Sequence, residues 1–269
     1  MKSPTRHALG LLLSCLAGTV VADKYHCVSL QYPPLIHQDD NGKVDGLAVE
    51  LVTAVFKRMG HGLSVEVLPW ARSLALMKAG ERDCIFTIFR NAEREAFLDF
   101  NQQSIIPQVV YFYAQKRAQL KFDGNMGLLL QYRIGTVNKI NYGPKFEENR
   151  SKMLLEEVGT LEQNFQKLAL GRVDLVPSNF YTASFTLEQA EVKPYARHLV
   201  KLPVPLDTVP SFIGFAKERK LQALAAQFDV ELKKVVHSGL YRKLLKKYNI
   251  QMTPELKSYL RTFQQAAVN

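Results

Sequence analysis

The sequence lacks the patterns that mark most enzymes and metal sites. Its six histidines are scattered and none stands in an H-x-x-x-H or Cys/His spacing, so we expect no bound metal. G-x-S-x-G, P-loop and G-x-G-x-x-G patterns are also missing, and no spacing pairs a nucleophile with a base. The sequence therefore predicts neither a cofactor nor catalytic residues. One well-placed carboxylate is enough for some reactions, so an enzyme stays as an alternative.

Long apolar runs are scarce, and the only one lies at the start of the chain. Lys2 and Arg6 precede an apolar run over residues 8–21, which ends in small and medium-sized residues. This pattern predicts a secretory signal peptide over residues 1–22 and a periplasmic mature chain. Cys15 leaves a lipidated N-terminus as the alternative. No later segment is apolar for long enough to cross a bilayer, so we expect the mature chain to be soluble.

Cysteine is rare, with three residues in the whole chain. Cys27 and Cys84 lie after the signal peptide, and both stand in segments that have the pattern of core strands. An oxidising compartment permits a disulfide, but a buried cysteine more often serves as a small apolar side chain. We therefore expect two unpaired thiols.

Acidic residues are too few to balance the basic ones, which leaves a formal net charge of +10. A basic surface can bind nucleic acid. The lysines, however, gather late in the chain, at Lys233, Lys234 and within residues 242–247, in segments whose other side is apolar. Such a pattern indicates the solvated face of a helix. We expect no nucleic-acid partner, and we expect a monomer.

The most informative stretch covers residues 68–100. After Pro69, apolar residues recur at helical spacing from Trp70 onward, and Gly80 favours a helix end just before it. Residues 84–89 are almost continuously apolar, which is typical of a strand buried on both faces of a parallel sheet. Open α/β sheets bind ligands at the carboxyl ends of such strands. We therefore expect a ligand site just after this strand.

Strand and helix patterns alternate through the chain. We expect strands over residues 25–31 and 63–68, with a helix between Gly46 and Gly60. Together with the helix and strand described above, this order predicts an α/β fold with a doubly wound parallel sheet. The later segments expected are a strand over 108–114, a strand over 133–137, a helix over 161–170, a strand over 173–177, a strand within 203–217, helices after residue 220 and a trailing helix within 251–269.

The turn after the buried strand carries a family resemblance. Arg94 follows Asn91 by three residues, and the segment Leu98-Asp99-Phe100-Asn101 comes next. This order resembles the periplasmic solute-binding proteins of the polar amino-acid type, which are receptors of ABC importers with the type 2 periplasmic-binding fold. The resemblance extends over roughly residues 25–250 and includes the closing run over residues 238–248.

The resemblance implies a particular architecture. Two lobes are expected, each a mostly parallel sheet flanked by helices, joined by two crossing strands. Residues 23–113 and 212–269 would form the first lobe and residues 114–211 the second. The implied partners are a small-molecule solute and the permease of an ABC transporter.

Several site residues of the first lobe follow from the resemblance. In this family an arginine at the position of Arg94 grips the carboxylate of the ligand, and the rigid donors of a guanidinium suit that role because they match a carboxylate in a bidentate way. A surface arginine paired with Glu93 or Glu95 is the alternative. Tyr32 and Trp70 take the positions of rings that contact the ligand, with ordinary packing as the alternative.

Three further positions belong to the same expected pocket. Thr87 and Phe89 are expected at its floor, which is bulkier than in the common form because apolar or charged residues replace the usual Thr or Gly before Arg94. Arg72 either joins the pocket or only caps the nearby helix, and the sequence leaves both interpretations open.

The second lobe is expected to contribute Asn138, Lys139 and Asn179. Asn138 and Lys139 follow a predicted strand, where exposed backbone amides at a helix start favour anions. Solvated loop side chains are the alternative. Asn179 takes the position of an acid that binds the α-ammonium of amino-acid ligands in the family. A neutral amide binds an ammonium less strongly, which argues against ordinary α-amino acids.

The leading hypothesis is a periplasmic receptor that closes on a small polar or carboxylate-bearing, amino-acid-like solute for an ABC importer. An enzyme on the same fold, of the cyclohexadienyl dehydratase kind, is one alternative. A sensing protein that delivers the closed form to a membrane receptor is the other.

Overall fold

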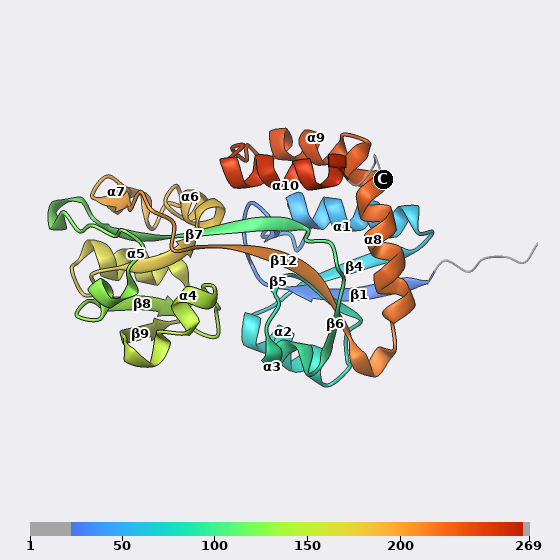
Figure 1. Ribbon diagram of the computed structural model, residues 1–269, viewed down its shortest axis with the longest axis horizontal. Helices are drawn as coiled ribbons and strands as arrows, with labels where there is room; N and C mark the ends of the chain where they lie inside the picture. The colour runs from blue at the N-terminus through green and yellow to red at the C-terminus, as the bar shows by residue number, and fades with distance from the viewer. Residues whose placement is uncertain (1–22, 266–269) are drawn as a thin grey trace, which may run out of the picture.

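The computed structural model describes residues 23–265 and divides them into two lobes (Figure 1). The expected signal peptide over residues 1–22 and the possible lipidation site Cys15 lie outside the described residues. The two lobes and the helices that flank their sheets confirm the predicted α/β, two-lobed architecture. The exact lobe boundaries stay a prediction.

The first lobe is built on three parallel strands in the order β5-β1-β4. These are β1 (Lys24–Ser29), β4 (Gly62–Val67) and β5 (Cys84–Phe89). Every residue of β5 is buried, as its continuous apolar run predicts. Helices α1 (Leu47–Arg58) and α2 (Trp70–Lys78) connect the strands, and α2 ends before Gly80 as expected.

Two long strands run from one lobe to the other (Figure 1). They are β7 (Ile106–Gln115) and β12 (Asp207–Ala216), and they pair antiparallel with each other between residues 106–110 and 207–211. Strand β12 also pairs antiparallel with β5, so the sheet of the first lobe continues into the crossing strands. The crossing strand β12 therefore pairs directly with the strand that precedes the expected ligand site.

The second lobe has a smaller parallel pair, β8 (Arg133–Val137) and β9 (Leu154–Val158). Strands β10 (Val176–Asn179) and β11 (Leu199–Lys201) pair antiparallel with β7. The strand predicted over residues 173–177 is thus placed too early, because Leu175 makes only an isolated bridge and the ladder begins at Val176. The helices of this lobe are α4 (Pro144–Glu147), α5 (Leu161–Ala169), α6 (Phe180–Thr186) and α7 (Lys193–Ala196).

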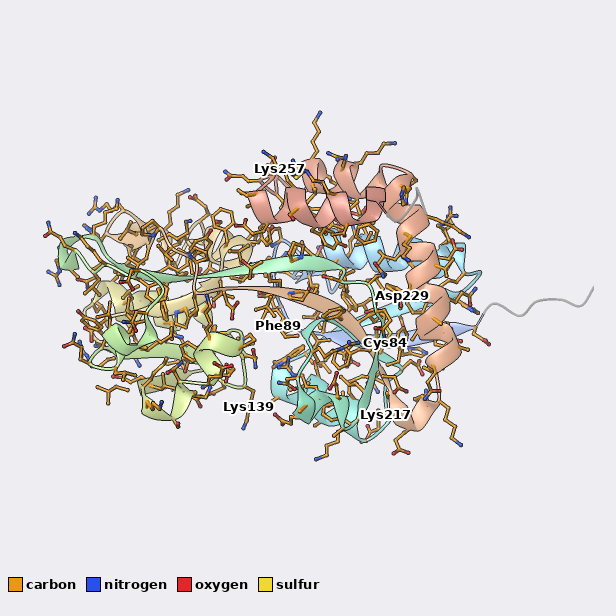
Figure 2. All side chains as sticks on the ribbon, viewed as in Figure 1. Cys84, Phe89, Lys139, Lys217, Asp229 and Lys257 are labelled. Carbon is orange, nitrogen blue, oxygen red and sulfur yellow. A yellow bond between two sulfur atoms is a disulfide. The ribbon has the colours of Figure 1, made fainter. Side chains whose placement is uncertain are left out.

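The C-terminal helices return to the first lobe. Helix α8 (Gln222–His237) packs on α1, α9 (Leu240–Lys247) packs on both, and α10 (Pro254–Gln265) lies against α8 and the crossing strand β7. Their lysines point away from the core, as Figure 2 shows for Lys257. The remaining strands are β2 (His37–Gln38), β3 (Val44–Asp45) and β6 (Leu98–Phe100), and the remaining α-helix is α3 (Ala92–Glu95). Four short 3-10 helices complete the described chain: η1 (Lys116–Ala118), η2 (Met126–Leu129), η3 (Arg150–Lys152) and η4 (Lys217–Arg219).

Each lobe has its own apolar core. One large cluster lies between the first sheet and helices α1, α8 and α9, and includes Phe56 and Phe228. A separate cluster in the second lobe includes Phe112 and Phe146. The side chain of Ile140 packs against the second-lobe cluster and also against a first-lobe cluster that contains Trp70. Ile140 therefore makes an apolar contact across the boundary of the lobes.

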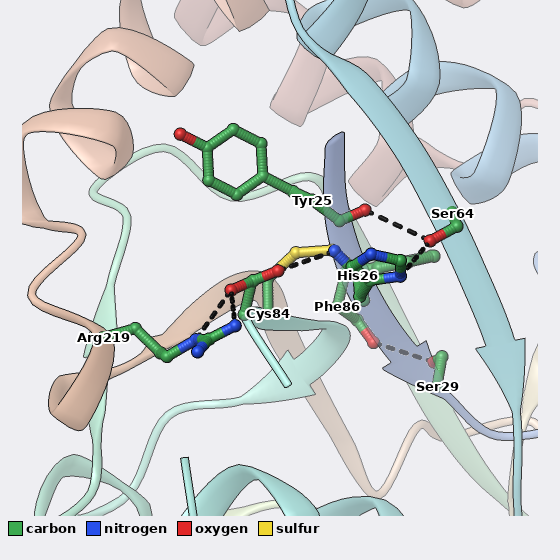
Figure 3. The surroundings of a disulfide bond; sticks show 9 residues. Tyr25, His26, Ser29, Ser64, Cys84, Phe86 and Arg219 are labelled. Carbon is green, nitrogen blue, oxygen red and sulfur yellow. Dashed lines mark hydrogen bonds and ion pairs between the residues drawn. A yellow bond between two sulfur atoms is a disulfide. The ribbon is translucent and has the colours of Figure 1, made fainter. Parts of the chain in front are cut away.

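The expectation of two unpaired thiols is wrong. Cys27 and Cys84 are bonded as a disulfide (Figure 3), and their Cα atoms lie 4.4 Å apart. They are direct partners in the neighbouring parallel strands β1 and β5, so both side chains leave the sheet on one face within the reach of a disulfide. Asp83, which directly precedes β5, binds residues on two sides of the disulfide. One of its carboxylate oxygens accepts the backbone N–H of His26 on β1 at 2.7 Å, and the other accepts Nε–H of Arg219 at 2.8 Å.

Membrane-spanning helices and metal-binding clusters concern only the described range, residues 23–265. Within that range no helix is both long enough and apolar enough to span a bilayer. Over the same described part of the chain, no three His, Cys, Asp or Glu side chains gather where they could hold a metal ion.

Candidate functional site

A small pocket opens at the carboxyl ends of β1 and β5, where the two lobes meet. That position is the usual ligand site of an open α/β sheet. First-lobe and crossing-strand residues form most of the wall, and the loop after β8 closes it from the second lobe. The lining residues are Leu30, Tyr32, Trp70, Thr87, Phe89, Arg94, Gln108, Ile140 and Asn141.

Arg94 is held by the turn after β5. The side-chain oxygen of Asn91 accepts the Arg94 backbone N–H at 2.9 Å, which caps the short helix α3. The guanidinium donates from Nη1 to the carbonyl of Phe89 at 2.8 Å and lies 5.5 Å from the centre of the Trp70 ring. The local fold thus turns the side chain back into the pocket rather than out to solvent.

Arg94 is buried, with 6% of its surface exposed. None of the ion pairs within the described residues includes Arg94. The nearby carboxylates pair with other arginines, since Glu95 binds Arg90 and Glu147 binds Arg150. Burial lowers the pKa of Arg94 to about 10, an effect that the more distant carboxylates of Glu93 and Glu147 only partly offset. A positive charge in this position lacks the counter-charge that buried charges normally have.

Two aromatic rings line the pocket together with Arg94. Trp70 begins α2 and is 8% exposed. Its buried indole N–H has no hydrogen-bond partner among residues 23–265. Tyr32 follows β1 and donates its hydroxyl to Oε1 of Gln108. Burial raises the pKa of Tyr32 well above its usual value, so the phenol stays protonated at neutral pH and remains a donor. The pocket therefore combines aromatic walls with hydrogen-bond donors.

Thr87 shapes the floor of the pocket. Its φ is +59°, which is unusual for a β-branched residue, and the β12 register shifts at this point from Phe212 opposite Ile88 to Ile213 opposite Phe86. Thr87 is thus the extra residue of a β-bulge. Its hydroxyl donates to the Phe86 carbonyl at 2.6 Å. Backbone strain of this kind often marks binding sites.

A hydrogen-bond chain links the floor to the second lobe. Gln108, on β7, donates from Nε2 to the Thr87 carbonyl at 3.3 Å and accepts from Nδ2 of Asn179 at 3.2 Å. The side-chain oxygen of Asn179 accepts the backbone N–H of Tyr181 at 2.8 Å and caps α6. Asn179 is buried and reaches the pocket through Gln108 rather than lining it.

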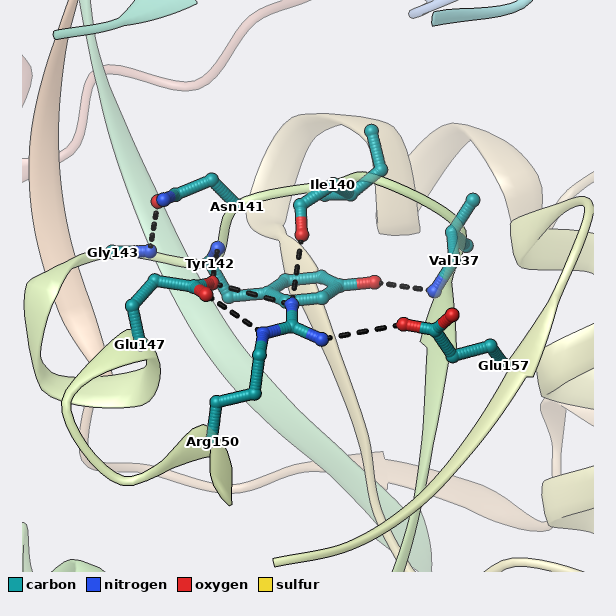
Figure 4. A network of polar contacts seen from close by, with 8 residues as sticks. All are labelled: Val137, Ile140, Asn141, Tyr142, Gly143, Glu147, Arg150 and Glu157. Atoms are coloured by element: carbon teal, nitrogen blue, oxygen red, sulfur yellow. Dashed lines mark hydrogen bonds and ion pairs between the residues drawn. The ribbon is translucent and has the colours of Figure 1, made fainter. Parts of the chain in front are cut away.

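The loop between β8 and α4 is fixed by a polar network (Figure 4). The Tyr142 hydroxyl accepts the Val137 N–H at 2.7 Å, and the Tyr142 N–H donates to Glu147 at 3.1 Å. Arg150 donates to Glu147 at 2.7 Å and to the Ile140 carbonyl at 3.0 Å. These bonds hold Ile140 and Asn141 against the pocket.

The structure brings five of the predicted site residues together in the pocket wall: Tyr32, Trp70, Thr87, Phe89 and Arg94. Figure 2 places Phe89 where the lobes meet. The surface alternative for Arg94, with Glu93 or Glu95 as partner, is not what the structure shows, because the guanidinium is buried and Glu95 pairs with Arg90.

Besides Asn179, three predicted residues lie outside the pocket wall. Arg72 is exposed, because a residue two positions after Trp70 projects from nearly the opposite side of the helix. Asn138 and Lys139 are exposed at a tight turn, in which the Ile140 N–H donates to the Val137 carbonyl at 3.1 Å and Lys139 has a φ of +61°. The turn directs the two residues after it, Ile140 and Asn141, to the pocket instead.

Four lining residues were not predicted: Leu30, Gln108, Ile140 and Asn141. Gln108 carries a detectable signal, since it is a polar residue at the start of an otherwise apolar strand. Ile140 has no such signal, because an apolar loop residue next to a strand is usually packed within its own lobe.

Comparisons with solved structures show the fold. A histidine kinase sensor domain with similarity to periplasmic binding proteins has a TM-score of 0.73 and 18% identity, over 84% of this chain and 96% of that chain. An ancestral arginine-binding protein bound to arginine has a TM-score of 0.71 and 18% identity, over 84% of this chain and 97% of that chain. A putative L-cystine ABC transporter from Listeria monocytogenes has a TM-score of 0.68 and 19% identity, over 84% of this chain and 96% of that chain.

No curated protein matches this chain. The family of bacterial extracellular solute-binding proteins, family 3, matches it over residues 26–251, which is most of its length and includes every residue of the pocket wall. The chain belongs to the bacterial extracellular solute-binding proteins, family 3.

Proposed function

We propose that this protein binds a small carboxylate-bearing solute in the periplasm and presents it to the permease of an ABC importer. The observation that carries the proposal is Arg94, a buried guanidinium in the pocket wall without an ion-pair partner among the described residues. A carboxylate would supply the missing charge and match the donor geometry. The family supports this role, as do similar structures described as an arginine-binding protein and a putative L-cystine ABC transporter.

The position of the pocket gives a mechanism for capture. Arg94 and Trp70 belong to the first lobe, while Ile140 and Asn141 come from the second. A ligand can contact both sets only when the lobes are together. Its binding energy would therefore favour the closed form, which the permease recognises. The crossing strands β7 and β12 would bend during this movement.

The anchor role of Arg94 can be tested with a matched pair of variants. Arg94→Ala removes the buried guanidinium, whereas Arg72→Ala removes an exposed arginine that does not line the pocket. Ligands are first found by a thermal-shift screen of small carboxylates, amino acids and amines. For a carboxylate hit, calorimetry should show binding about 100-fold weaker for Arg94→Ala, since a charge-assisted pair is lost, and unchanged for Arg72→Ala. Equal affinity of the parent protein and Arg94→Ala would contradict the anchor role.

The two alternatives predict different results with the same hits. A receptor should return the ligand unchanged, so chromatography after long incubation should show a single species. An enzyme would convert it. The sensing alternative has some support, because a histidine kinase sensor domain shares the fold. Copurification with a tagged permease or a tagged membrane kinase separates transport from sensing.

A further inference from the structure

We infer that the ligand is a carboxylate without an ammonium group, such as a 2-oxo acid or a plain aliphatic or aromatic acid. This inference rests on the proposed function and names the chemical class that the same pocket selects. It follows from the charges and from the free hydrogen-bonding groups of the pocket wall.

The pocket wall contains one positive charge and no carboxylate. None of its nine residues is Asp or Glu. Glu93 is exposed, and Glu147 is engaged by the Tyr142 N–H and by Arg150. An α-amino acid would bring its ammonium into a buried site without a counter-charge, which is unfavourable. A simple carboxylate would bring only the negative charge that Arg94 lacks.

The orientation of Gln108 can be fixed from its neighbours. The Thr87 carbonyl can only accept, so the Gln108 atom that faces it at 3.3 Å must be the donor Nε2. Asn179 uses its oxygen to cap α6, so its NH₂ group faces Oε1 of Gln108. Tyr32 also donates to Oε1. Both acceptor sites of this amide are therefore occupied, and its second N–H has no partner among the described residues.

Two other acceptors near the pocket already have donors from the protein. The Phe89 carbonyl accepts from Arg94, and the side-chain oxygen of Asn141 accepts the Gly143 N–H at 2.9 Å. The Thr87 hydroxyl donates to the Phe86 carbonyl, and its oxygen lies 3.5 Å from the Ser29 hydroxyl. An ammonium has three donors and no acceptor, so it would lose its bonds to water and find little in exchange.

Donors, by contrast, are in excess. Within the part of the chain that the structure describes, Arg94 has only Nη1 engaged, Gln108 has one free N–H, and the indole N–H of Trp70 is buried without a partner. Apolar surface from Leu30, Phe89 and Ile140 surrounds these groups. The wall therefore complements a ligand with acceptor oxygens at one end and an apolar body.

Matched acids test the inference directly. Calorimetry at neutral pH would compare leucine with 4-methyl-2-oxopentanoate and 4-methylpentanoate, and phenylalanine with phenylpyruvate and 3-phenylpropionate. In each set the carbon skeleton is constant and only the α-substituent changes. We expect at least one acid without an ammonium to bind, and its affinity should exceed that of the matching amino acid by about tenfold or more. The reason is that burying the ammonium without hydrogen-bond acceptors costs free energy.

A Gln108→Glu variant provides the second test. It places a carboxylate in the wall, so acids without an ammonium should bind more weakly and the amino acid of the same set should bind more tightly than to the parent protein. Thermal unfolding checks that the variant is folded. If it is not folded, the calorimetric comparison of amino acids and ammonium-free acids on the parent protein tests the inference by itself.

The outcomes separate the two proposals. An amino acid that binds the parent as tightly as its ammonium-free counterpart, or more tightly, would overturn this inference and leave carboxylate capture intact. A folded parent protein that binds no member of either set, nor any carboxylate of the wider screen, would count against capture itself.

Discussion

At the scale of single residues, the main feature is that a buried charge is kept without a partner. Arg94 has one bond to a carbonyl and a ring beside it, but these do not replace a carboxylate. Such a residue lowers the stability of the empty protein, because its charge has lost its water. Binding sites commonly accept this kind of cost in exchange for affinity.

Removing the charge should therefore stabilise the empty protein. Arg94→Met keeps an unbranched apolar chain but no guanidinium, and we expect the free energy of unfolding to rise by about 1 kcal/mol while carboxylate binding is lost. Urea denaturation of the ligand-free protein at neutral pH measures the change. Arg72→Met, at an exposed position, should alter it by less than about 0.5 kcal/mol. Destabilisation by Arg94→Met would show that the guanidinium has a structural role instead.

The same variant has a predicted pH dependence. Burial lowers the pKa of Arg94 from its ordinary value, which the unfolded chain keeps, to about 10 in the folded protein. Between these values the unfolded chain binds more protons than the folded one, so the parent gains stability as the pH rises through 10. The difference in the free energy of unfolding between Arg94→Met and the parent should therefore be constant between pH 6 and 9 and become smaller above pH 10. Urea denaturation of both proteins at several pH values measures this difference.

Sequence patterns predict those site residues that belong to a single strand end. Arg94, Trp70 and Tyr32 each follow a strand or begin a helix, and this position, together with the family resemblance, predicts that they lie at the ligand edge. Ile140 lines the pocket only because the two lobes meet there, and no local pattern encodes that contact. Gln108 differs, since a polar residue near the start of a mostly apolar strand is a local signal.

At the scale of elements, the sequence correctly predicts that the loop after β8 reaches the pocket, but it predicts the wrong residues of that loop in the pocket wall. A tight turn rotates Asn138 and Lys139 outward, and the backbone hydrogen bond that makes the turn is not visible in composition. The disulfide was missed for a related reason. Residues 27 and 84 are far apart in the chain, and they pair only because β5 lies beside β1 in the sheet.

Gly143 ends this loop and should be required for it. Its φ is +105°, and an added Cβ would lie 2.7 Å from a carboxylate oxygen of Asp207 and 2.9 Å from a methyl carbon of Val209 on β12. Gly143→Ala should therefore push the loop away from the crossing strand and weaken both folding and binding. We expect a loss of about 2–4 kcal/mol in the free energy of unfolding, from backbone strain and overpacking together.

Gly124 supplies a matched control. Its φ of +103° is nearly the same, but a Cβ there would have no neighbour within 4 Å. Gly124→Ala should cost only the backbone strain, about 1–2 kcal/mol, and leave ligand affinity unchanged. Equal losses for the two variants in urea denaturation would mean that contact with β12 is unimportant for the loop.

At the scale of the whole molecule, the two lobes are linked by two strands and by apolar contacts between them. Tyr181 of α6 belongs to the first-lobe cluster, and Ile140, in the pocket wall, packs against clusters of both lobes. A contact made only when the lobes are together stabilises the closed form relative to the open one. The resting position of the lobes should therefore depend on this residue even without ligand.

Ile140→Ser tests this dependence. Losing the apolar contact should shift the ligand-free protein toward open forms, so small-angle X-ray scattering should give a larger radius of gyration than for the parent. Affinity should fall about fivefold to tenfold, because the ligand must then supply more of the closing energy. Leu170→Ser, at a residue of the second lobe that is 56% exposed, should change neither quantity. A radius that stays equal to the parent's, together with weaker binding, would instead show that Ile140 acts only as pocket wall and does not set the position of the lobes.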